Sequence, residues 1–433
     1  MKLPSSSVLV LWLVAAVAHA ATINVTSSSG DSNDGSGCTL RDAIQAVNTA
    51  TPAGQCPAGT GGNVVNTINI QVNSIGFSIA DQHSTNAALP AVVAGRLLNL
   101  YGMPQVRTSL SVLSTCDLSH VLTPIFTQRL LEVRAGATVN VADVNFSLGC
   151  PGAAGGAIAN YGTLYLVRSR LSNNSNASPN LIGAPTYFNG GAIYSGPDAQ
   201  LSVSDATFDS NSGNGAVYVD SDPTTGYASV DRSTFVGNRG GGINNAGALA
   251  VTNTTFVNNL GRQIGGGILP FIEFPGGAIL STGFLNLSFA SLRNNSIPVI
   301  SGSSTELDIG ANSTAWIKST LFGTPAGQNT SNCYGGNGAS VFWSGVSISD
   351  DATCVGGSNL VSTNTGLDAN LADNGGSTQT LKLLVDSPAF GVDADCLDSS
   401  ATPVTIDQRG FNRPLIRCDA GAYEDTIFAN GFE

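Results

Sequence analysis

Charged side chains recur at one position of an internal sequence repeat, three residues before an aligned Phe or Leu. In successive repeats this position holds Asp143, Arg168, Asp205, Arg232 and Asn253. Opposite charges stacked on neighbouring strands form ion pairs that stabilise a sheet by about 0.2–1 kcal/mol each. The other interpretation is a polar groove that holds a glycan of zero or mixed charge, and to which the neighbouring Asp231 also contributes.

Carboxylates at this spacing also make polysaccharide hydrolysis a hypothesis to weigh. Hydrolysis of a glycosidic bond uses two carboxyl groups about 5–10 Å apart across a cleft, and Asp205 and Asp231 are the candidate pair. The chain lacks the paired Asp, Gly-His-Gly and Arg-x-Lys motifs of polygalacturonases, and the long inserts 172–190 and 260–276 contain no acid–base pair. Binding is therefore favoured over catalysis, with a polysaccharide lyase or glycoside hydrolase as the alternative.

The repeat predicts the elements that carry these residues. Apolar alternation precedes the aligned aromatic residue in LYLVRSRL, LSVSDATF, ASVDRSTF and LAVTNTTF, at intervals of 21 to 37 residues. A period of two indicates β-strands, and strands this short bury a core only when successive repeats stack in a coil. We therefore expect an all-β fold, a single right-handed parallel β-helix with disulfide-containing caps at both ends. The Gly-Gly-Ala-Ile phrase at 155–158 and 190–193 predicts tight turns that need positive φ.

A column of asparagines follows the aligned Phe or Leu by three residues. Its members are Asn174, Asn211, Asn238, Asn259 and Asn295. Asn tolerates left-handed backbone geometry, and Asn side chains stacked on adjacent strands can hydrogen-bond to one another as a ladder. We expect a structural ladder, and a row of amides that binds sugar is the alternative.

The chain divides into five parts at the points where its composition changes. They are a signal peptide (1–20), an N-terminal cap and early rungs (21–130), the regular β-helix (131–345), C-terminal rungs and cap (346–425), and a tail (426–433). Only 41–47 looks helical, and this short helix could cap the first rung. The tail is either a sorting or attachment signal or a last strand docked on the cap.

The first twenty residues are typical of a signal peptide. Lys2 gives the positively charged start, and an apolar stretch from Val8 forms the core. The sequence AHA, which ends at Ala20, is the expected cleavage site. No second apolar run of this kind occurs, so we expect no transmembrane segment in the mature chain. These features predict Sec-dependent export. The tail 426–433 resembles short aromatic tails of secreted proteins from Gram-negative bacteria, which implies a location outside or on the outer surface of such a cell.

The cysteine content agrees with export. Eight cysteines fall into four local pairs: Cys38/Cys56, Cys116/Cys150, Cys333/Cys354 and Cys396/Cys418. Eight cysteines permit about a hundred connectivities, and neighbour pairing is favoured because it closes short loops. Disulfides persist in oxidising compartments outside the cytosol.

Charge restricts the partners and cofactors. A formal net charge of −12 disfavours nucleic acid, whose phosphates require clustered Lys and Arg. Polysaccharides or cell-surface components are the expected partners, and no cofactor or metal is expected. Two acidic loops offer a structural calcium site as an alternative to solvated turns. Their carboxylate and amide residues are Asp31, Asn33 and Asp34 in one loop, and Asp393, Asp395 and Asp398 in the other.

The two ends of the chain resemble a known family. The stretch CTLRDAI (38–44) resembles the Cys-Ser-Leu-Arg-Glu-Ala motif near the start of many exported bacterial proteins, with Thr39 and Asp42 as conservative changes. The stretches 373–393 and 407–424 are similar to the C-terminal signature of the choice-of-anchor Q proteins, through Asp-Gln-Arg-Gly, Arg-Pro and Cys-Asp-Ala-Gly-Ala-Tyr-Glu. The resemblance implies an exported, surface-associated β-helix and no catalytic residues. We expect a structural, adhesive or glycan-binding protein.

Overall fold

The structure is a computed structural model of the chain. It describes residues 19–30, 35–77, 87–112, 128–178, 186–264, 272–274, 276–297, 304–323, 331–354, 356–362 and 364–425. Most of the predicted signal peptide, the tail 426–433, Cys116, and the acidic loop of Asp31, Asn33 and Asp34 lie outside the described residues.

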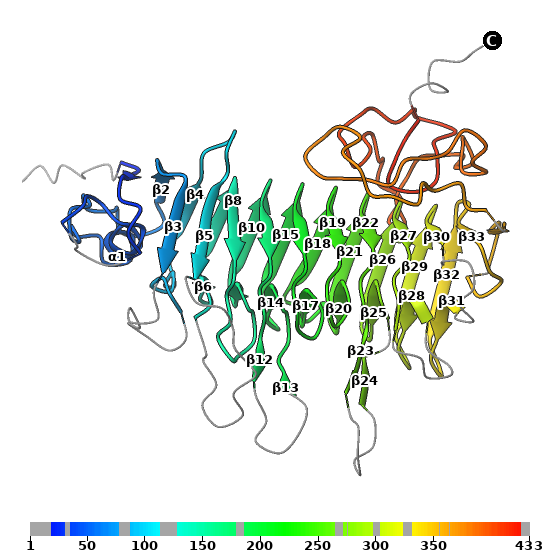
Figure 1. Cartoon of the computed structure of the whole chain (residues 1–433), viewed down its shortest axis with the longest axis horizontal. Helices are drawn as coiled ribbons and strands as arrows, with labels where there is room; N and C mark the ends of the chain where they lie inside the picture. Colours follow the sequence, from blue (N-terminus) through cyan, green and yellow to red (C-terminus); the bar gives the residue numbers. More distant parts are fainter. Residues whose placement is uncertain are drawn as a thin grey trace, which may run out of the picture.

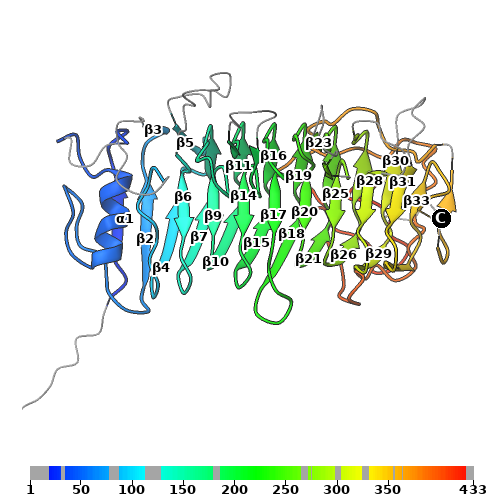
Figure 2. The same cartoon turned by 90° about the horizontal axis from the view of Figure 1, so that it is seen from below.

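Three long parallel sheets run along one axis and form a β-helix (Figures 1 and 2). Each regular coil passes through the third sheet, then the first, then the second. The fold class predicted from the repeat, a parallel β-helix, is therefore confirmed.

The strands of the three sheets have the following bounds. The first sheet contains β1 (Thr22–Val25), β2 (Val65–Ile70), β4 (Leu97–Tyr101), β7 (Thr138–Ala142), β10 (Thr163–Val167), β15 (Gln200–Ser204), β18 (Tyr227–Asp231), β21 (Ala248–Thr252), β26 (Phe284–Ser288), β29 (Thr314–Lys318) and β32 (Ser340–Ser344). The second contains β3 (Ser74–Phe77), β5 (Thr108–Val112), β8 (Val144–Ser147), β11 (Arg170–Ser172), β16 (Thr207–Asp209), β19 (Thr234–Val236), β22 (Thr255–Val257), β27 (Ser291–Arg293), β30 (Leu321–Gly323), β33 (Ile348–Ser349) and β34 (Leu360–Val361). The third contains β6 (Leu131–Val133), β9 (Ile158–Asn160), β14 (Ile193–Ser195), β17 (Val217–Val219), β20 (Ile243–Asn245), β25 (Ile279–Ser281), β28 (Ser304–Ile309) and β31 (Ser331–Gly335).

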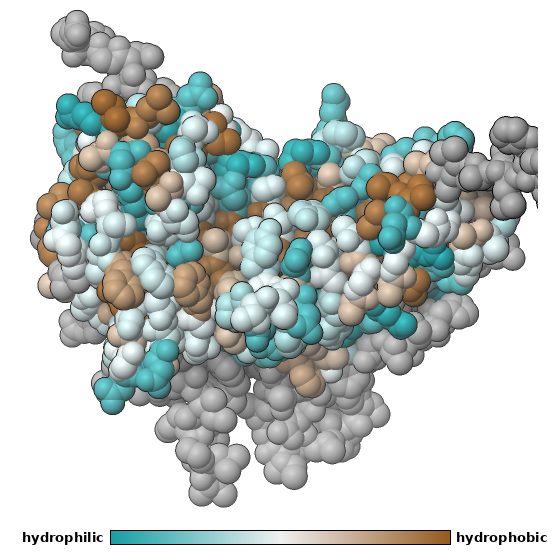
Figure 3. Space-filling view, turned by 180° about the vertical axis from the view of Figure 1, so that it is seen from behind, coloured by the Kyte–Doolittle hydropathy of each residue, from teal (hydrophilic) through white to brown (hydrophobic). Residues whose placement is uncertain are grey.

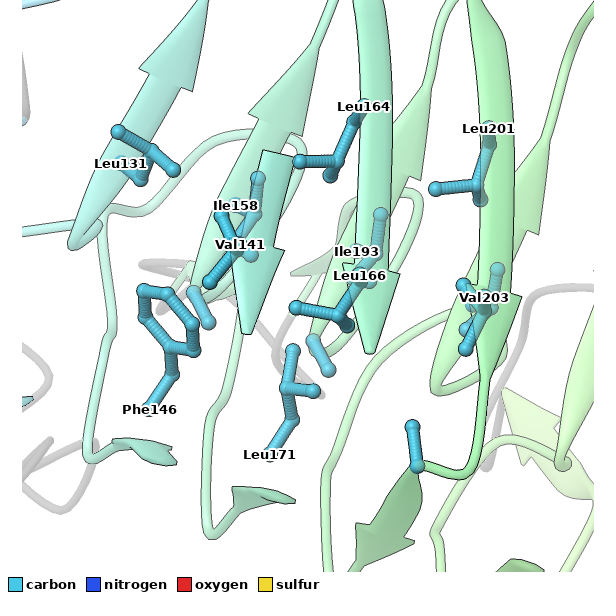
Figure 4. Close-up of a cluster of buried hydrophobic side chains, with 14 of the residues drawn as sticks. Leu131, Val141, Phe146, Ile158, Leu164, Leu166, Leu171, Ile193, Leu201 and Val203 are labelled. Carbon is cyan, nitrogen blue, oxygen red and sulfur yellow. The ribbon is translucent and has the colours of Figure 1, made fainter. Parts of the chain in front are cut away.

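The core is a stack of identical inward positions. Alternate residues of each strand point inward, so that Leu166 of β10 lies beside Val141 of β7 and Val203 of β15. Figure 4 shows side chains from all three sheets meeting in the interior, among them Phe146 and Leu171 of the second sheet. Further along the axis Phe208, Phe235 and Phe256 stack with ring centroids 4.5 and 4.8 Å apart. The apolar alternation of the sequence is therefore the inward face of the coil.

The Gly-Gly-Ala-Ile phrases form the turns that enter the third sheet. Gly155 and Gly190 have φ of 75° and 74°, which residues with a side chain adopt at a cost. The second glycine is needed for close packing of neighbouring coils, because a Cβ on Gly156 would lie 1.9 Å from the carbonyl oxygen of Gly191. Two antiparallel hairpins project from the coil (Figure 1): β12 (Ala177–Ser178) with β13 (Thr186–Tyr187), and β23 (Arg262–Ile264) with β24 (Ile272–Phe274).

A helix covers the N-terminal end of the coil. Helix α1 (Leu40–Thr49) packs against β1 and β2, and its buried Leu40 and Ile44 belong to the main core. Thr39 caps the helix, its hydroxyl accepting a hydrogen bond from the amide of Asp42, and a Cys38–Cys56 disulfide closes the cap. The CTLRDAI motif is therefore a helix start with its cap and core contacts.

The C-terminal segment, residues 364–425, lies along the side of the coil (Figure 1). It rests on the corner between the first and second sheets, near β19 to β30, and makes turns and isolated bridges in place of regular strands. Its disulfide joins Cys396 to Cys418. Among the described residues, no helix is long and apolar enough to cross a membrane.

Candidate functional site

The predicted charged residues lie on the corner where the chain passes from the first sheet to the second. At this corner one residue in left-handed conformation turns the backbone, with φ between 46° and 60° at every position. The corner column comprises Arg107, Asp143, Arg168, Asp205, Arg232, Asn253, Phe289 and Ser319. Left-handed φ is unusual outside Gly, Asn and Asp, so the column marks a position where the fold tolerates local strain.

Asp143 and Arg168 form a two-pronged ion pair. The Nε and Nη2 atoms of Arg168 donate to the two carboxylate oxygens of Asp143 over 2.9 and 2.7 Å. The Asp143 side chain is almost fully buried while Arg168 is half exposed. This hydrogen bonding raises the pKa of Arg168 above its ordinary value. The pair presents a neutral, fixed polar group at the corner.

Asp205 and Asp231 share a single guanidinium. Arg232 donates to both oxygens of Asp205 over 3.1 and 2.9 Å, and its Nη1 also donates to Asp231. Burial raises the pKa of Asp231, and the nearby Arg232 opposes that shift. The two carboxylates of the hydrolytic hypothesis are therefore both engaged by the same guanidinium, and the second oxygen of Asp231 is buried.

Arg107 belongs to the same column and was missed in the sequence. It stands three residues before the inward Leu110, which pairs with Phe146 of the next coil. Its Nη2 donates to the carbonyl oxygen of Ser377 in the C-terminal segment over 3.3 Å. The signal for Arg107 is the same spacing that marks Asp143: it precedes Leu110 in the alternating stretch TSLSV by three residues.

The C-terminal segment covers the remaining corner residues. The Asn253 amide donates to the carbonyl of Ile406 and accepts from Arg413 Nη2, each over 3.0 Å. Phe289 is buried beneath the Cys396–Cys418 disulfide and the guanidinium of Arg413. The Ser319 hydroxyl hydrogen-bonds to Asp393. The covered corner therefore serves as the docking surface of the segment.

The residues of the C-terminal signature make this docking specific. Buried Gln408 donates through Nε2 to the carbonyl of Ser233 and the hydroxyl of Thr234, and it accepts from Thr255. Arg413 donates to Glu424 over 2.6 Å with both side chains buried. Burial raises the pKa of Glu424 to about 7, although Arg413 opposes the shift.

A groove on the outer face of the first sheet meets the solvent-facing part of the corner. Its volume is about 630 Å³, and its lining includes Asp143 and Arg168. The predicted Asp205, Asp231 and Arg232 do not line it. The other lining residues are Asn69, Tyr101, Gly102, Pro104, Asn140, Val141, Ala142, Tyr165 and Val167. In the view from behind, the outline of the molecule dips beside the C-terminal segment (Figure 3).

Two tyrosines flank the floor of this first-sheet groove. Tyr101 and Tyr165 are each 38% exposed and lie on β4 and β10. The strand between them, β7, contributes Asn140 opposite Tyr165 and Ala142 opposite Tyr101. The tyrosines are therefore two strand spacings apart across the sheet and two residues apart along it, about 12 Å between their Cα atoms. Nothing in the sequence marks them as partners, because they are far apart in the chain and share no motif.

The five asparagines form a continuous hydrogen-bonded ladder. Each Nδ2 donates to the Oδ1 of the next residue over 2.7 to 3.0 Å, from Asn174 to Asn295. All five side chains are fully buried. Beyond the last one, Asn295 donates to the buried carboxyl of Glu306, whose pKa burial raises well above its ordinary value. Their burial assigns them to the structure of the coil rather than to ligand contact.

Three of the predicted disulfides are confirmed: Cys38–Cys56, Cys333–Cys354 and Cys396–Cys418. Cys150 is also disulfide-bonded, while its predicted partner Cys116 lies outside the described residues.

The carboxylates of the second acidic loop hydrogen-bond to other groups of the protein. Asp393 and Asp395 accept hydrogen bonds from Ser319 and Lys318 as well as from backbone amides, and Asp398 accepts from the amides of its own turn. The one possible three-ligand metal group among the described residues combines Asp393 with Cys396 and Cys418, whose sulfurs are bonded to each other.

Comparisons with known proteins give no family for this chain: no family model matches it, and no curated protein or solved structure is detectably similar.

Proposed function

We propose that this protein is an exported, surface-associated β-helix that binds uncharged glycan chains in the first-sheet groove. The observation that carries the proposal is the arrangement of Tyr101 and Tyr165 on either side of a floor containing Asn140. Grooves that combine exposed aromatic rings with a few polar groups are the usual form of small-ligand sites.

The chemistry of the groove suits a sugar ring. A pyranose has C–H groups on its faces and hydroxyls around its edge. A tyrosine ring offers an apolar surface to the former and a polar tip to the latter. The amides of Asn69 and Asn140 can each donate and accept hydrogen bonds. Because Asp143 and Arg168 neutralise each other at the groove edge, the lining residues favour an uncharged ligand.

Binding is favoured over hydrolysis by the position of the candidate carboxylates. Asp205 and Asp231 are both held by Arg232, and neither lines the groove. A general acid or base must reach the bond that it acts on.

Two further observations support export and surface association. The described cysteines are oxidised, as is usual outside the cytosol. The residues that carry the resemblance to the choice-of-anchor Q proteins, Gln408 and Arg413 among them, are buried in the interface of the C-terminal segment. The proposal therefore includes membership of that family.

The test is a screen of uncharged and charged polysaccharides for co-elution with the oxidised mature protein by size exclusion. We expect an uncharged polymer to co-elute without shortening, and the Tyr101→Ala/Tyr165→Ala double variant to lose it. Shortening of a polymer that Asp205→Asn or Asp231→Asn abolishes would replace binding with hydrolysis. Co-elution with no uncharged polymer, or co-elution unchanged in the double variant, would refute the proposed site.

A further inference from the structure

A second groove lies on the outer face of the third sheet. Its volume is about 520 Å³. The groove is lined by Asn214, Tyr218, Asn244, Leu280, Thr282, Asp308, Gly310, Ala311, Tyr334, Gly336 and Asn337. Four of these residues form one row across β20, β25, β28 and β31, because Asn244, Leu280, Asp308 and Tyr334 are register partners in turn. The groove therefore crosses several rungs along the helix axis.

Asp308 is the unusual member of this row. Its side chain stands in a groove, yet the residue is only 3% exposed. Within the described part of the chain, its carboxyl group takes part in no ion pair or side-chain hydrogen bond. Burial raises its pKa to about 7, with no opposing contribution from a neighbouring cation. A buried carboxyl without a partner costs stability, and such groups in clefts are candidates for ligand contact.

The residues around Asp308 supply polar and aromatic groups but no cation. No Lys, Arg or His is among the described residues that line the groove. Tyr334, the register partner of Asp308 on β31, is 43% exposed and lines the same groove. On the other side, Asn244 donates to Asn214 over 2.6 Å and Asn214 to Asn189 over 2.9 Å. The site thus has a negative charge, an aromatic ring and amides, and it lacks a cation.

We propose that the third-sheet groove binds a hexosamine unit with a free primary ammonium group, which pairs with the carboxylate of Asp308 beside the ring of Tyr334. An ammonium group supplies the charge-assisted hydrogen bonds that the carboxylate lacks. It is also attracted to the face of a tyrosine ring. Thr282, Asn244 and Asn337 offer hydrogen-bonding partners for the hydroxyls of this unit and of the next sugar in the chain. The net charge of −12 draws cationic glycans toward the protein as a whole.

The test is isothermal titration of the oxidised full-length protein with a glucosamine hexamer and with its fully N-acetylated counterpart. We expect the glucosamine hexamer to bind more tightly. Asp308→Asn should weaken it about tenfold or more, because a charge-assisted pair is lost. The same change should leave the acetylated hexamer unaffected. Asn is nearly the same size as Asp and removes a buried charge, so we expect the variant to fold, which its thermal midpoint will check.

A second variant and a matched control keep the test independent of the first-sheet groove. Tyr334→Ala should also weaken the glucosamine hexamer, whereas Tyr165→Ala should leave its affinity at the third sheet unchanged. Equal affinity of wild type and Asp308→Asn for the glucosamine hexamer, or no binding by the wild type, would overturn the proposal. A loss in Tyr165→Ala alone would assign the amine-bearing ligand to the first-sheet groove instead.

Discussion

The corner between the first and second sheets has two halves with the same backbone and different chemistry. In the solvent-facing half the turning residue is charged, from Arg107 to Arg232. The C-terminal segment reaches this half at its two ends, through Ser377 at Arg107 and through Thr378 at the Arg232 carbonyl. In the half covered by the C-terminal segment the turning residue is Asn253, Phe289 or Ser319. All of them have left-handed φ. The backbone position therefore does not select the residue type.

The difference between charged and neutral corner residues follows from their access to water and from the docking of the C-terminal segment. In the pair of Asp143 and Arg168 the guanidinium stays half exposed to water, which lowers the desolvation cost of the pair. Under the C-terminal segment a charge at the corner would lose that water, and a neutral residue contacts the segment instead. The charges of the covered half lie on the segment itself, where Arg413 meets Glu424. Docking has thus covered one half of the corner, while Asp143 and Arg168 of the other half line the first-sheet groove.

The largest expected effect comes from breaking the buried pair of the covered half. Arg413→Ala leaves Glu424 buried without its cation and should cost about 3–5 kcal/mol of unfolding free energy. Denaturant unfolding measures it. The control in the solvent-facing half is Arg168→Ala. If Arg413→Ala lowers the unfolding free energy no more than Arg168→Ala does, then covering the corner does not change the energetic weight of its ion pairs.

The asparagine ladder lies at the far end of the second-sheet strands and runs past rungs of both halves, so it should not distinguish them. Asn211→Leu and Asn259→Leu each remove a buried amide that hydrogen-bonds to both neighbours, at a cost of about 2–4 kcal/mol. Thermal midpoints should fall by similar amounts in the two variants. An unchanged midpoint in either would contradict the ladder as a structural device.

The covered half should also depend on pH through Glu424. Its pKa is raised to about 7, so the native state holds this proton more tightly than the unfolded chain does. The resulting stability is complete below the ordinary Glu pKa near 4.3 and is lost as the pH rises through 7, up to about 3 kcal/mol. We expect wild type to lose more stability than Glu424→Gln between pH 5 and pH 8. Parallel pH profiles would rule this out.

The smallest effect is expected for the ion pair that faces solvent. Arg168→Ala should cost about 1 kcal/mol, since Arg168 is half exposed and water can replace it. High salt should reduce that cost because it screens the pair. Chemical denaturation with urea at two salt concentrations provides the measurement. A loss of more than about 3 kcal/mol of unfolding free energy in Arg168→Ala would show that this pair behaves like the buried pair of Arg413 and Glu424.

The sequence predicted the elements whose signal is local and periodic. Alternating apolar residues indicated the strands, and a fixed offset from Phe208 or Phe235 located both the asparagine ladder and the charged column. The C-terminal segment has no period, so its position along the side of the coil could not be predicted. Its signature residues gave no sign that Gln408 reaches Ser233 across the corner.

The grooves depend on coil register, which the irregular repeat lengths conceal. Tyr101 and Tyr165 line the same groove only because β4, β7 and β10 pair in register. Asp308 lies in a strand whose polar and apolar residues alternate as in other strands. Only the structure shows that Asp308 is buried and that Tyr334 is its neighbour. Sites made of single residues from distant coils carry no motif.

The most direct measurement compares two tyrosines of the same sheet. Tyr165 lines the first-sheet groove, while Tyr227 is 50% exposed on the same sheet but lies outside it. Titration calorimetry with the uncharged polymer found in the screen should show Tyr165→Ala binding about five- to tenfold more weakly than wild type, the loss of one aromatic contact. Tyr227→Ala should bind as wild type does. Equal losses in both variants, or none in either, would contradict a glycan site beside the solvent-facing corner.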